Sequence, residues 1–207
     1  MATPHGNFRK GEPNDPLRCA IFISGSGSGM HALLEHQKQK KECKHRTVVV
    51  ISNNPEAGGI EIAKKLAIPV EVIELPQMED KRERRLNHES NIDAVLRKFD
   101  VELIILSGYM RLLSAEFVNK WEMKIVNIHP SLLPKFPGAH AHRDVLAAGS
   151  KVSGCTVHFV DSGMDTGKII AQRKVPVFSD DTIETLSSRI KVEEHILYPS
   201  VIDDLAN

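Results

Sequence analysis

The chain has 207 residues, which is long enough for one well-buried domain and short for two. Its 41% hydrophobic and 26% charged residues are typical of a globular protein, and 27 basic and 27 acidic residues leave no net charge to attract nucleic acid or an anionic membrane. Three scattered cysteines suit neither a disulfide scaffold nor a zinc site, and no apolar run approaches the roughly 18 residues that span a bilayer. We therefore expect a cytoplasmic protein, in a reducing compartment, that acts on small molecules.

A polar N-terminal segment precedes short apolar runs that alternate with helical patterns. Residues 1–16 are rich in Pro and Gly and lack the apolar stretch of a secretory signal, so we expect a flexible tail ahead of a single domain, residues 17–207. Strands are predicted over residues 19–24, 47–52, 70–75, 103–107 and 124–129. Helices are predicted between them over residues 30–42, 58–66 and 81–99. This alternation predicts an α/β fold with a doubly wound, mostly parallel, Rossmann-like sheet.

The pattern changes after residue 129. Prolines at positions 130, 134 and 137 exclude a continuous helix and predict a loop. Two strand-like segments, residues 155–160 and 168–177, predict an antiparallel C-terminal extension of the sheet. A closing helix is predicted over residues 182–205, with Thr182 as its N-cap and Pro199 as the point where it kinks or ends.

The sequence ISGSGSGM, residues 23–30, lies between the first predicted strand and the first predicted helix. Glycines at positions 25, 27 and 29 allow a sharp turn and a close approach of the backbone to a ligand, and N–H groups at the helix start suit a phosphate. The loop lacks the third glycine of a dinucleotide fingerprint and the GK[ST] of a nucleoside triphosphate site. We therefore expect a phosphate monoester here. The alternative is an ordinary tight turn.

The sequence NIHPSLLPKFPG, residues 127–138, begins at the end of a predicted strand. Asn127 and His129 alternate along that strand, so their side chains face the same way, at the edge where open α/β sheets bind ligands. A neutral amide donor beside a titratable imidazole suits the oxyanion of an acyl transfer. The alternative is a histidine that is satisfied by local backbone bonds.

The sequence DSGMDTGKI, residues 161–169, places two aspartates in a predicted loop. Taken alone, the pattern is typical of ordinary Asp-Gly turns. Asp165 becomes a catalytic candidate only if the fold brings it to His129, where a carboxylate favours the imidazolium and fixes its orientation.

Other polar clusters give weaker signals. His140 and His142 lack the partners and spacing of a zinc site, so no metal is expected. The run KRERR, residues 81–85, is typical of a solvated helix start, although one arginine there can meet an acidic ligand. The serines of the glycine-rich loop do not form the G-x-S-x-G elbow of a hydrolase.

These motifs together resemble the glycinamide ribonucleotide transformylase family, the folate-dependent formyltransferases of purine synthesis. The resemblance runs from about Leu17 to near the C-terminus. The motifs that carry it are ISGSGSG, SGYMRLLS (residues 107–114), NIHPSLLPKFPG, TVHFVDSGMDTGKIIAQ (residues 156–172) and EEHILYP (residues 193–199). One position departs from the pattern, because the family usually has Asn where Gly29 stands.

The resemblance implies a role for each matching residue. The implied catalytic set is Asn127, His129 and Asp165. The implied nucleotide-binding residues are Gly27, Ser28, Gly29 and Lys191 for the phosphate, and Glu194 for the ribose hydroxyls. The implied folate-binding residues are Arg85 for the tail carboxylate, Arg111 for the pterin edge, and Met110, Leu112, Leu113, Val118 and Ile125 for the pterin pocket.

The reaction that the resemblance implies is formyl transfer from the co-substrate 10-formyltetrahydrofolate to the amine of glycinamide ribonucleotide. Direct attack would give a tetrahedral oxyanion, with no metal and no covalent enzyme intermediate, in a monomer or homodimer. One alternative is a transferase of the same fold for methionyl-tRNA or an amino sugar; the tRNA enzyme is expected to have a further C-terminal domain and a basic surface. A formyltetrahydrofolate hydrolase is expected to have an N-terminal regulatory domain. A non-catalytic phosphate-binding module would need the loop without the catalytic set.

Overall fold

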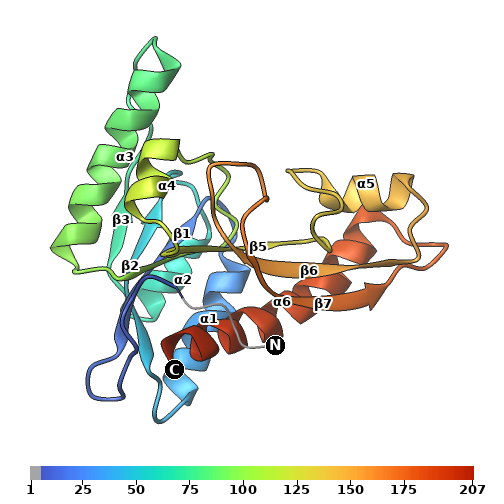
Figure 1. Ribbon diagram of the computed structural model, residues 1–207, viewed down its shortest axis with the longest axis horizontal. Coiled ribbons are helices and arrows are strands. Elements are labelled where there is room, and N and C mark those ends of the chain that lie inside the picture. The colour runs from blue at the N-terminus through green and yellow to red at the C-terminus, as the bar shows by residue number, and fades with distance from the viewer. Residues whose placement is uncertain (1–5) are drawn as a thin grey trace.

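The computed structural model describes residues 6–207, and one seven-stranded sheet lies at its centre (Figure 1). The strands are β1 (Leu17–Ile23), β2 (His45–Ser52), β3 (Val70–Val72), β4 (Leu103–Leu106), β5 (Ile125–His129), β6 (Val152–Phe159) and β7 (Ile169–Pro176). Their order is β3-β2-β1-β4-β5-β6-β7; the first five pair in parallel, and β6 and β7 pair antiparallel. The predicted α/β fold, with its mostly parallel sheet and antiparallel extension, is confirmed.

The direction of the chain across the sheet reverses beside β1. The chain leaves β1 toward β2 and β3, and then crosses back to enter β4 on the other side of β1. In open α/β sheets, ligands bind in the crevice outside the carboxyl ends of the strands at such a reversal. The segments that follow β1, β4 and β5, residues 24–27, 107–114 and 130–138, all start from that edge.

Helices cover both faces of the sheet. They are α1 (Ser28–Gln39), α2 (Gly59–Lys65), α3 (Lys81–Lys98), α4 (Ala115–Lys120), α5 (Ala141–Ala147) and α6 (Ile183–Ala206). One core lies beneath α1, α2 and α6 and includes Leu33, Ile60 and Ile202. A second core lies beneath α3 and α4 and includes Ile92 and Phe117. Cover on both faces explains the continuous apolar runs of the central strands. Within residues 6–207, no helix is long and apolar enough to cross a membrane.

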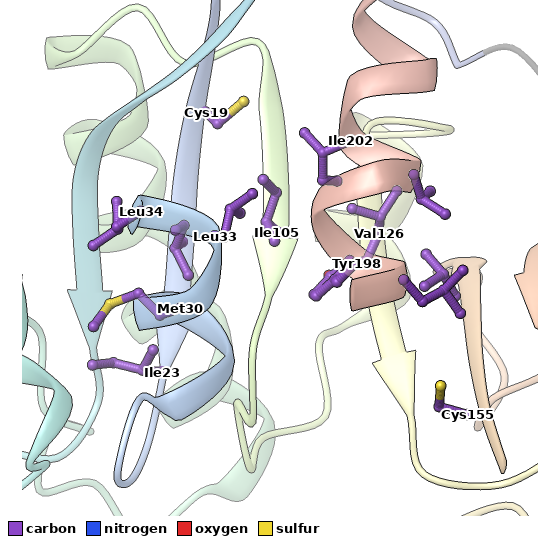
Figure 2. Close-up of a cluster of buried hydrophobic side chains, with 14 of the residues drawn as sticks. Cys19, Ile23, Met30, Leu33, Leu34, Ile105, Val126, Cys155, Tyr198 and Ile202 are labelled. Carbon is purple, nitrogen blue, oxygen red and sulfur yellow. The ribbon is translucent and has the colours of Figure 1, made fainter. Parts of the chain in front are cut away.

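Tyr198 fixes helix α6 to the sheet. Figure 2 shows Tyr198 and Ile202 of α6 beside Ile105 and Val126 of two neighbouring strands. The Tyr198 hydroxyl is buried and lies 2.9 Å from the carbonyl oxygen of Leu106 and 3.0 Å from that of Val126. Because a buried hydroxyl needs such a partner, this contact holds the middle of α6 against β4 and β5.

The structure differs from the sequence-based elements in ways that have physical reasons. Helices α4 and α5 are absent from the prediction because they have only 6 and 7 residues, too few to display a clear helical period. Helix α2 is equally short, but it lies between two predicted strands that need a helical crossover. Helix α6 does not end at Pro199, because packing of that segment on the core outweighs the one backbone bond that proline removes. Thr182 caps α6 as predicted, in a reciprocal pair with Thr185.

Residues 6–16 lie against the domain, whereas the sequence predicts a tail outside the fold. The Arg9 guanidinium pairs with Glu102 at 2.7 Å, and Gly11 N–H donates to the carbonyl of Ala206 at 2.9 Å. Glu102 lies directly before β4, and Ala206 is the last residue of α6. The segment therefore lies away from the carboxyl ends of the strands. Residues 1–5 of the predicted tail lie outside the described residues.

Candidate active site

Two of the predicted catalytic side chains extend from the carboxyl end of β5. Asn127 and His129 are two positions apart on this strand, so they lie on the same face. The strand is fixed on both sides here, because Asn127 is opposite Leu106 of β4 and His158 of β6. His129 is only 5% exposed. The strand therefore presents an amide and a mostly buried imidazole to the same side of the sheet.

The third predicted catalytic residue, Asp165, comes from the loop between β6 and β7. Its Oδ2 lies 3.3 Å from His129 Nδ1 and accepts a 2.8 Å hydrogen bond from Gly138 N–H. Asp165 has a φ of 56°, in the left-handed region that aspartate tolerates better than most residues. On the other side of the ring, His129 Nε2 lies 2.8 Å from the carbonyl oxygen of Phe136. Both ring nitrogens thus face acceptors, and a doubly protonated ring can donate to both.

His158 of β6 joins this cluster, although the sequence analysis does not single it out. Its Nδ1–H donates to the carbonyl of Phe159 at 2.8 Å, and its Nε2 accepts from the Asn127 amide at 3.2 Å. Burial lowers the pKa of His158, which keeps the ring neutral and Nε2 an acceptor. The ring therefore orients the Asn127 amide and leaves its second hydrogen for another acceptor. A histidine inside the apolar run of a strand is the signal that could have found it.

The glycine-rich loop between β1 and α1 has the geometry of an anion site. Gly27 has a φ of 71°, and a Cβ there would lie 2.6 Å from Gly59 Cα, so only glycine fits. The first backbone bond of α1 runs from His31 N–H to Gly27 O at 2.8 Å. The N–H groups of Ser28 and Gly29 precede it and are available to an anion at the positive end of the helix.

Two predicted nucleotide-binding residues, Lys191 and Glu194, occupy neighbouring turns of α6, which packs on α1. The Lys191 side chain is exposed, whereas Glu194 is partly buried. Burial raises the pKa of Glu194 to about 7, and the charge of Lys191 opposes this only in part. Among residues 6–207 the Glu194 carboxylate has neither a hydrogen bond nor an ion pair, so it is available to an outside partner.

The residues predicted to bind folate divide into an exposed set and a buried set. Exposed side chains are those of Arg85 on α3 and of Met110, Arg111 and Leu112 in the loop after β4. Leu113 is half-buried, while Val118 and Ile125 are buried in the core beneath α3 and α4. The structure therefore places an exposed apolar segment beside the core, with Val118 and Ile125 below it.

The loop after β4 is fixed at both ends. Met110 N–H donates to Ser24 Oγ at 2.8 Å, and Ser24 lies at the start of the glycine-rich loop. At the other end, Ser114 N–H donates to the buried Glu89 carboxylate at 2.6 Å. Ser24 N–H in turn donates to the carbonyl of Gly108 at 3.2 Å, so two hydrogen bonds join the predicted folate segment to the predicted phosphate loop.

One cluster of potential metal ligands lies elsewhere, where His36, His45 and Asp203 meet. Its hydrogen bonds fit an ion-pair network instead. The Lys40 ammonium lies 2.8 Å from Asp203 Oδ2. The Gln37 amide donates to His45 Nδ1, since its oxygen already accepts a backbone N–H, so the proton of His45 is on Nε2 and points at Asp203. A metal would need that nitrogen deprotonated.

Comparisons with known proteins identify the family of this chain. A family model described as formyl transferase matches residues 17–202. The chain belongs to the formyl transferase family. This formyl transferase is 44% identical over 190 residues to the trifunctional purine biosynthetic protein adenosine-3 of Bos taurus. The aligned region covers 92% of the chain and 18% of that protein. It is 41% identical over 194 residues to the chloroplastic phosphoribosylglycinamide formyltransferase of Vigna unguiculata, covering 91% of the chain and 60% of that protein.

A solved structure extends the similarity to the whole fold. The phosphoribosylglycinamide formyltransferase of Brucella melitensis superposes on this formyl transferase with a TM-score of 0.84 and is 43% identical to it. The superposition covers 92% of this chain and 96% of that chain. The chain spans only 13% to 20% of the length of the trifunctional relatives. The predicted cytoplasmic location and the predicted monomer or homodimer stay predictions.

Proposed function

We propose that this formyl transferase moves the formyl group of 10-formyltetrahydrofolate to the amine of glycinamide ribonucleotide. The names of the plant relative and of the Brucella structure support this acceptor. The observation that carries the proposal is the convergence of Asn127, His129 and Asp165 at the sheet edge from which the glycine-rich loop also starts. An acyl-transfer group near an anion site suits an amine that carries a phosphate monoester.

The two substrates occupy neighbouring parts of this edge in the proposal. The N–H groups of residues 27–29 and the Lys191 ammonium hold the phosphate, and the unpartnered Glu194 carboxylate accepts the ribose hydroxyls. The folate lies along the loop after β4. Its pterin contacts are Met110, Arg111, Leu112, Leu113, Val118 and Ile125, and Arg85 pairs with its tail carboxylate.

The reaction proceeds by direct attack. The uncharged amine forms a bond to the formyl carbon, and the carbonyl π electrons move to oxygen. The free amide hydrogen of Asn127 and the positive ring of His129 stabilise this oxyanion. The amine proton passes through water, with Asp165 as acceptor, to N10 of the folate. The carbonyl then re-forms as the bond to N10 breaks, so positioning and oxyanion stabilisation supply the rate enhancement.

The orientation of His129 sets a condition on this mechanism. Its Nε2 is directed at the Phe136 carbonyl. A direct hydrogen bond from His129 to the oxyanion therefore requires the ring or residue 136 to shift, as catalytic hydrogen bonds often do when the substrate complex forms. Without that shift, His129 acts through its charge, while Asn127 supplies the hydrogen bond.

The variant Asp165→Asn tests the proposal, with Asp161→Asn as its matched control in the same loop. Asp165→Asn removes the charge beside His129 and should lower kcat for transfer to glycinamide ribonucleotide by about 10² to 10³, with little change in either KM. Asp161 is exposed and, within the described part of the chain, accepts hydrogen bonds only from Gly163 N–H and the Thr166 hydroxyl, so its variant should stay within about threefold of the wild type. Near-normal turnover of Asp165→Asn, or an equal loss in both variants, would exclude the proposed role of Asp165.

A further inference from the structure

Ser107 is a mostly buried residue between the glycine-rich loop and the predicted folate segment. It directly follows β4, and its N–H donates to the carbonyl of Phe22 in β1 at 2.9 Å. It is 9% exposed. Its hydroxyl makes no hydrogen bond with any of residues 6–207. It is therefore available to a ligand that reaches this edge of the sheet.

The hydroxyl is directed at the start of α1. A Cβ built on Gly29 would lie 2.8 Å from Ser107 Oγ, and apart from its two chain neighbours and the backbone of α1 no other atom of residues 6–207 lies within 4 Å of that position. Gly29 is the second residue of α1, so its N–H belongs to the first turn and is not used by the helix. The Ser107 hydroxyl therefore lies in the space that a side chain at position 29 would fill, next to the N–H groups of the helix start.

We propose that Ser107 binds the phosphate of the nucleotide, donating its O–H to a phosphoryl oxygen that the first turn of α1 also holds. Two independent features converge on this point. One is the pair of free N–H groups at the positive end of a 12-residue helix, and the other is the unpartnered hydroxyl of Ser107, a residue that is only 9% exposed. A hydroxyl donor to an anion forms a short and strong hydrogen bond. Gly29 is the residue that leaves room for it. The identity of the nucleotide rests on the function proposed above.

The variant Ser107→Ala removes only this donor. For glycinamide ribonucleotide we expect an increase in Kd and KM of about tenfold, as is usual for a hydrogen bond to a charged group, with kcat and the folate KM unchanged. For the same ribonucleoside without phosphate, Ser107→Ala and the wild type should have equal Kd values. An equal loss of affinity for both compounds would overturn the proposal, because the hydroxyl would then act on the ribose or glycinamide.

The variant Gly29→Ala gives a second and independent test. Its Cβ would have to displace the Ser107 hydroxyl, which can turn away because it is the end of a side chain. Gly29→Ala should therefore cause about the same tenfold loss as Ser107→Ala, and the double variant should be no worse than either single variant. Additive losses would overturn the proposal, since they would mean that the two positions act on the ligand separately.

Binding of inorganic phosphate separates this inference from the function proposed above. Calorimetric titration of wild type and Ser107→Ala with inorganic phosphate needs no formyl transfer, and we expect the wild type to bind about tenfold more tightly. If that difference is seen while transfer to glycinamide ribonucleotide fails, the phosphate site stands and the acceptor is another phosphate ester. Equal phosphate affinity of the two proteins would overturn the role of Ser107, whatever the acceptor.

Discussion

Glu194 should make the fold less stable as pH rises, and Glu194→Gln should remove that effect. The side chain lies partly buried on α6, and this burial raises the pKa of its carboxyl group from 4.5 to about 7. A group with a higher pKa in the folded state holds its proton more tightly when folded. Its contribution is therefore most favourable below about pH 4.5 and is lost as the pH rises to about 7. An amide has the shape of the protonated acid and does not ionise.

The size of the effect follows from the two pKa values. A pKa of about 7 in the folded state, against 4.5 in the unfolded state, corresponds to about 3 kcal/mol of lost stability above pH 7. We expect Glu194→Gln to exceed the wild type by about 3 kcal/mol in free energy of unfolding at pH 8. At pH 5 the two proteins should differ by no more than about 1 kcal/mol.

Urea denaturation at pH 5 and pH 8 measures this difference, with Glu193→Gln as the control. Glu193 precedes Glu194 on the same helix, but its carboxylate pairs with Arg173 at 2.7 Å at the surface. Glu193→Gln should lose up to about 1 kcal/mol at both pH values. The reasoning is refuted if Glu194→Gln is no more stable than the wild type at pH 8, or if Glu193→Gln shows the same gain.

The remaining predictions concern binding and packing. Gly27→Ala should raise the nucleotide KM far more than the folate KM. The new Cβ would lie 2.6 Å from Gly59 Cα, and a φ of 71° disfavours alanine, so the loop would be distorted. Equal effects on both KM values would argue against a phosphate loop. Arg85→Ala should raise the KM of a folate that carries its tail carboxylate and leave unchanged that of an analogue without it; Arg82→Ala, which loses only a surface ion pair, is the control. Tyr198→Phe should lower the free energy of unfolding by about 0.5 to 1.5 kcal/mol in urea denaturation, since it removes the hydrogen bond of this buried hydroxyl; an unchanged value would contradict the anchoring role of this hydroxyl.

The sequence predicts the elements that have a regular apolar pattern and the helix ends that have a local capping residue. Strands such as β1 and β2 are predictable because an apolar run covered on both faces needs no polar alternation. Thr182 is predictable as an N-cap because its side chain acts within one turn. The course of α6 through Pro199 is not predictable, since it depends on packing against strands far away in sequence.

The candidate site divides in the same way. Asn127 and His129 are recognisable locally, because two polar residues alternate at the end of one strand. The 3.3 Å approach of Asp165 to His129 depends on the antiparallel pairing of β6 with β5 and β7, which carries the loop back to the site. No local pattern predicts the proposed contact of Ser107 with the phosphate. That contact is inferred from the unpartnered hydroxyl of Ser107 and from its closeness to Gly29, which only the fold shows.

The most direct measurement is formyl transfer by the purified protein with 10-formyltetrahydrofolate, followed by the absorbance change of the released folate and by mass spectrometry of the acceptor. Glycinamide ribonucleotide should be required for folate release and should gain one formyl group for each folate released. Folate release at the same rate without the nucleotide would instead indicate a hydrolase. No reaction with the nucleotide, but transfer to another amine, would contradict the proposed acceptor.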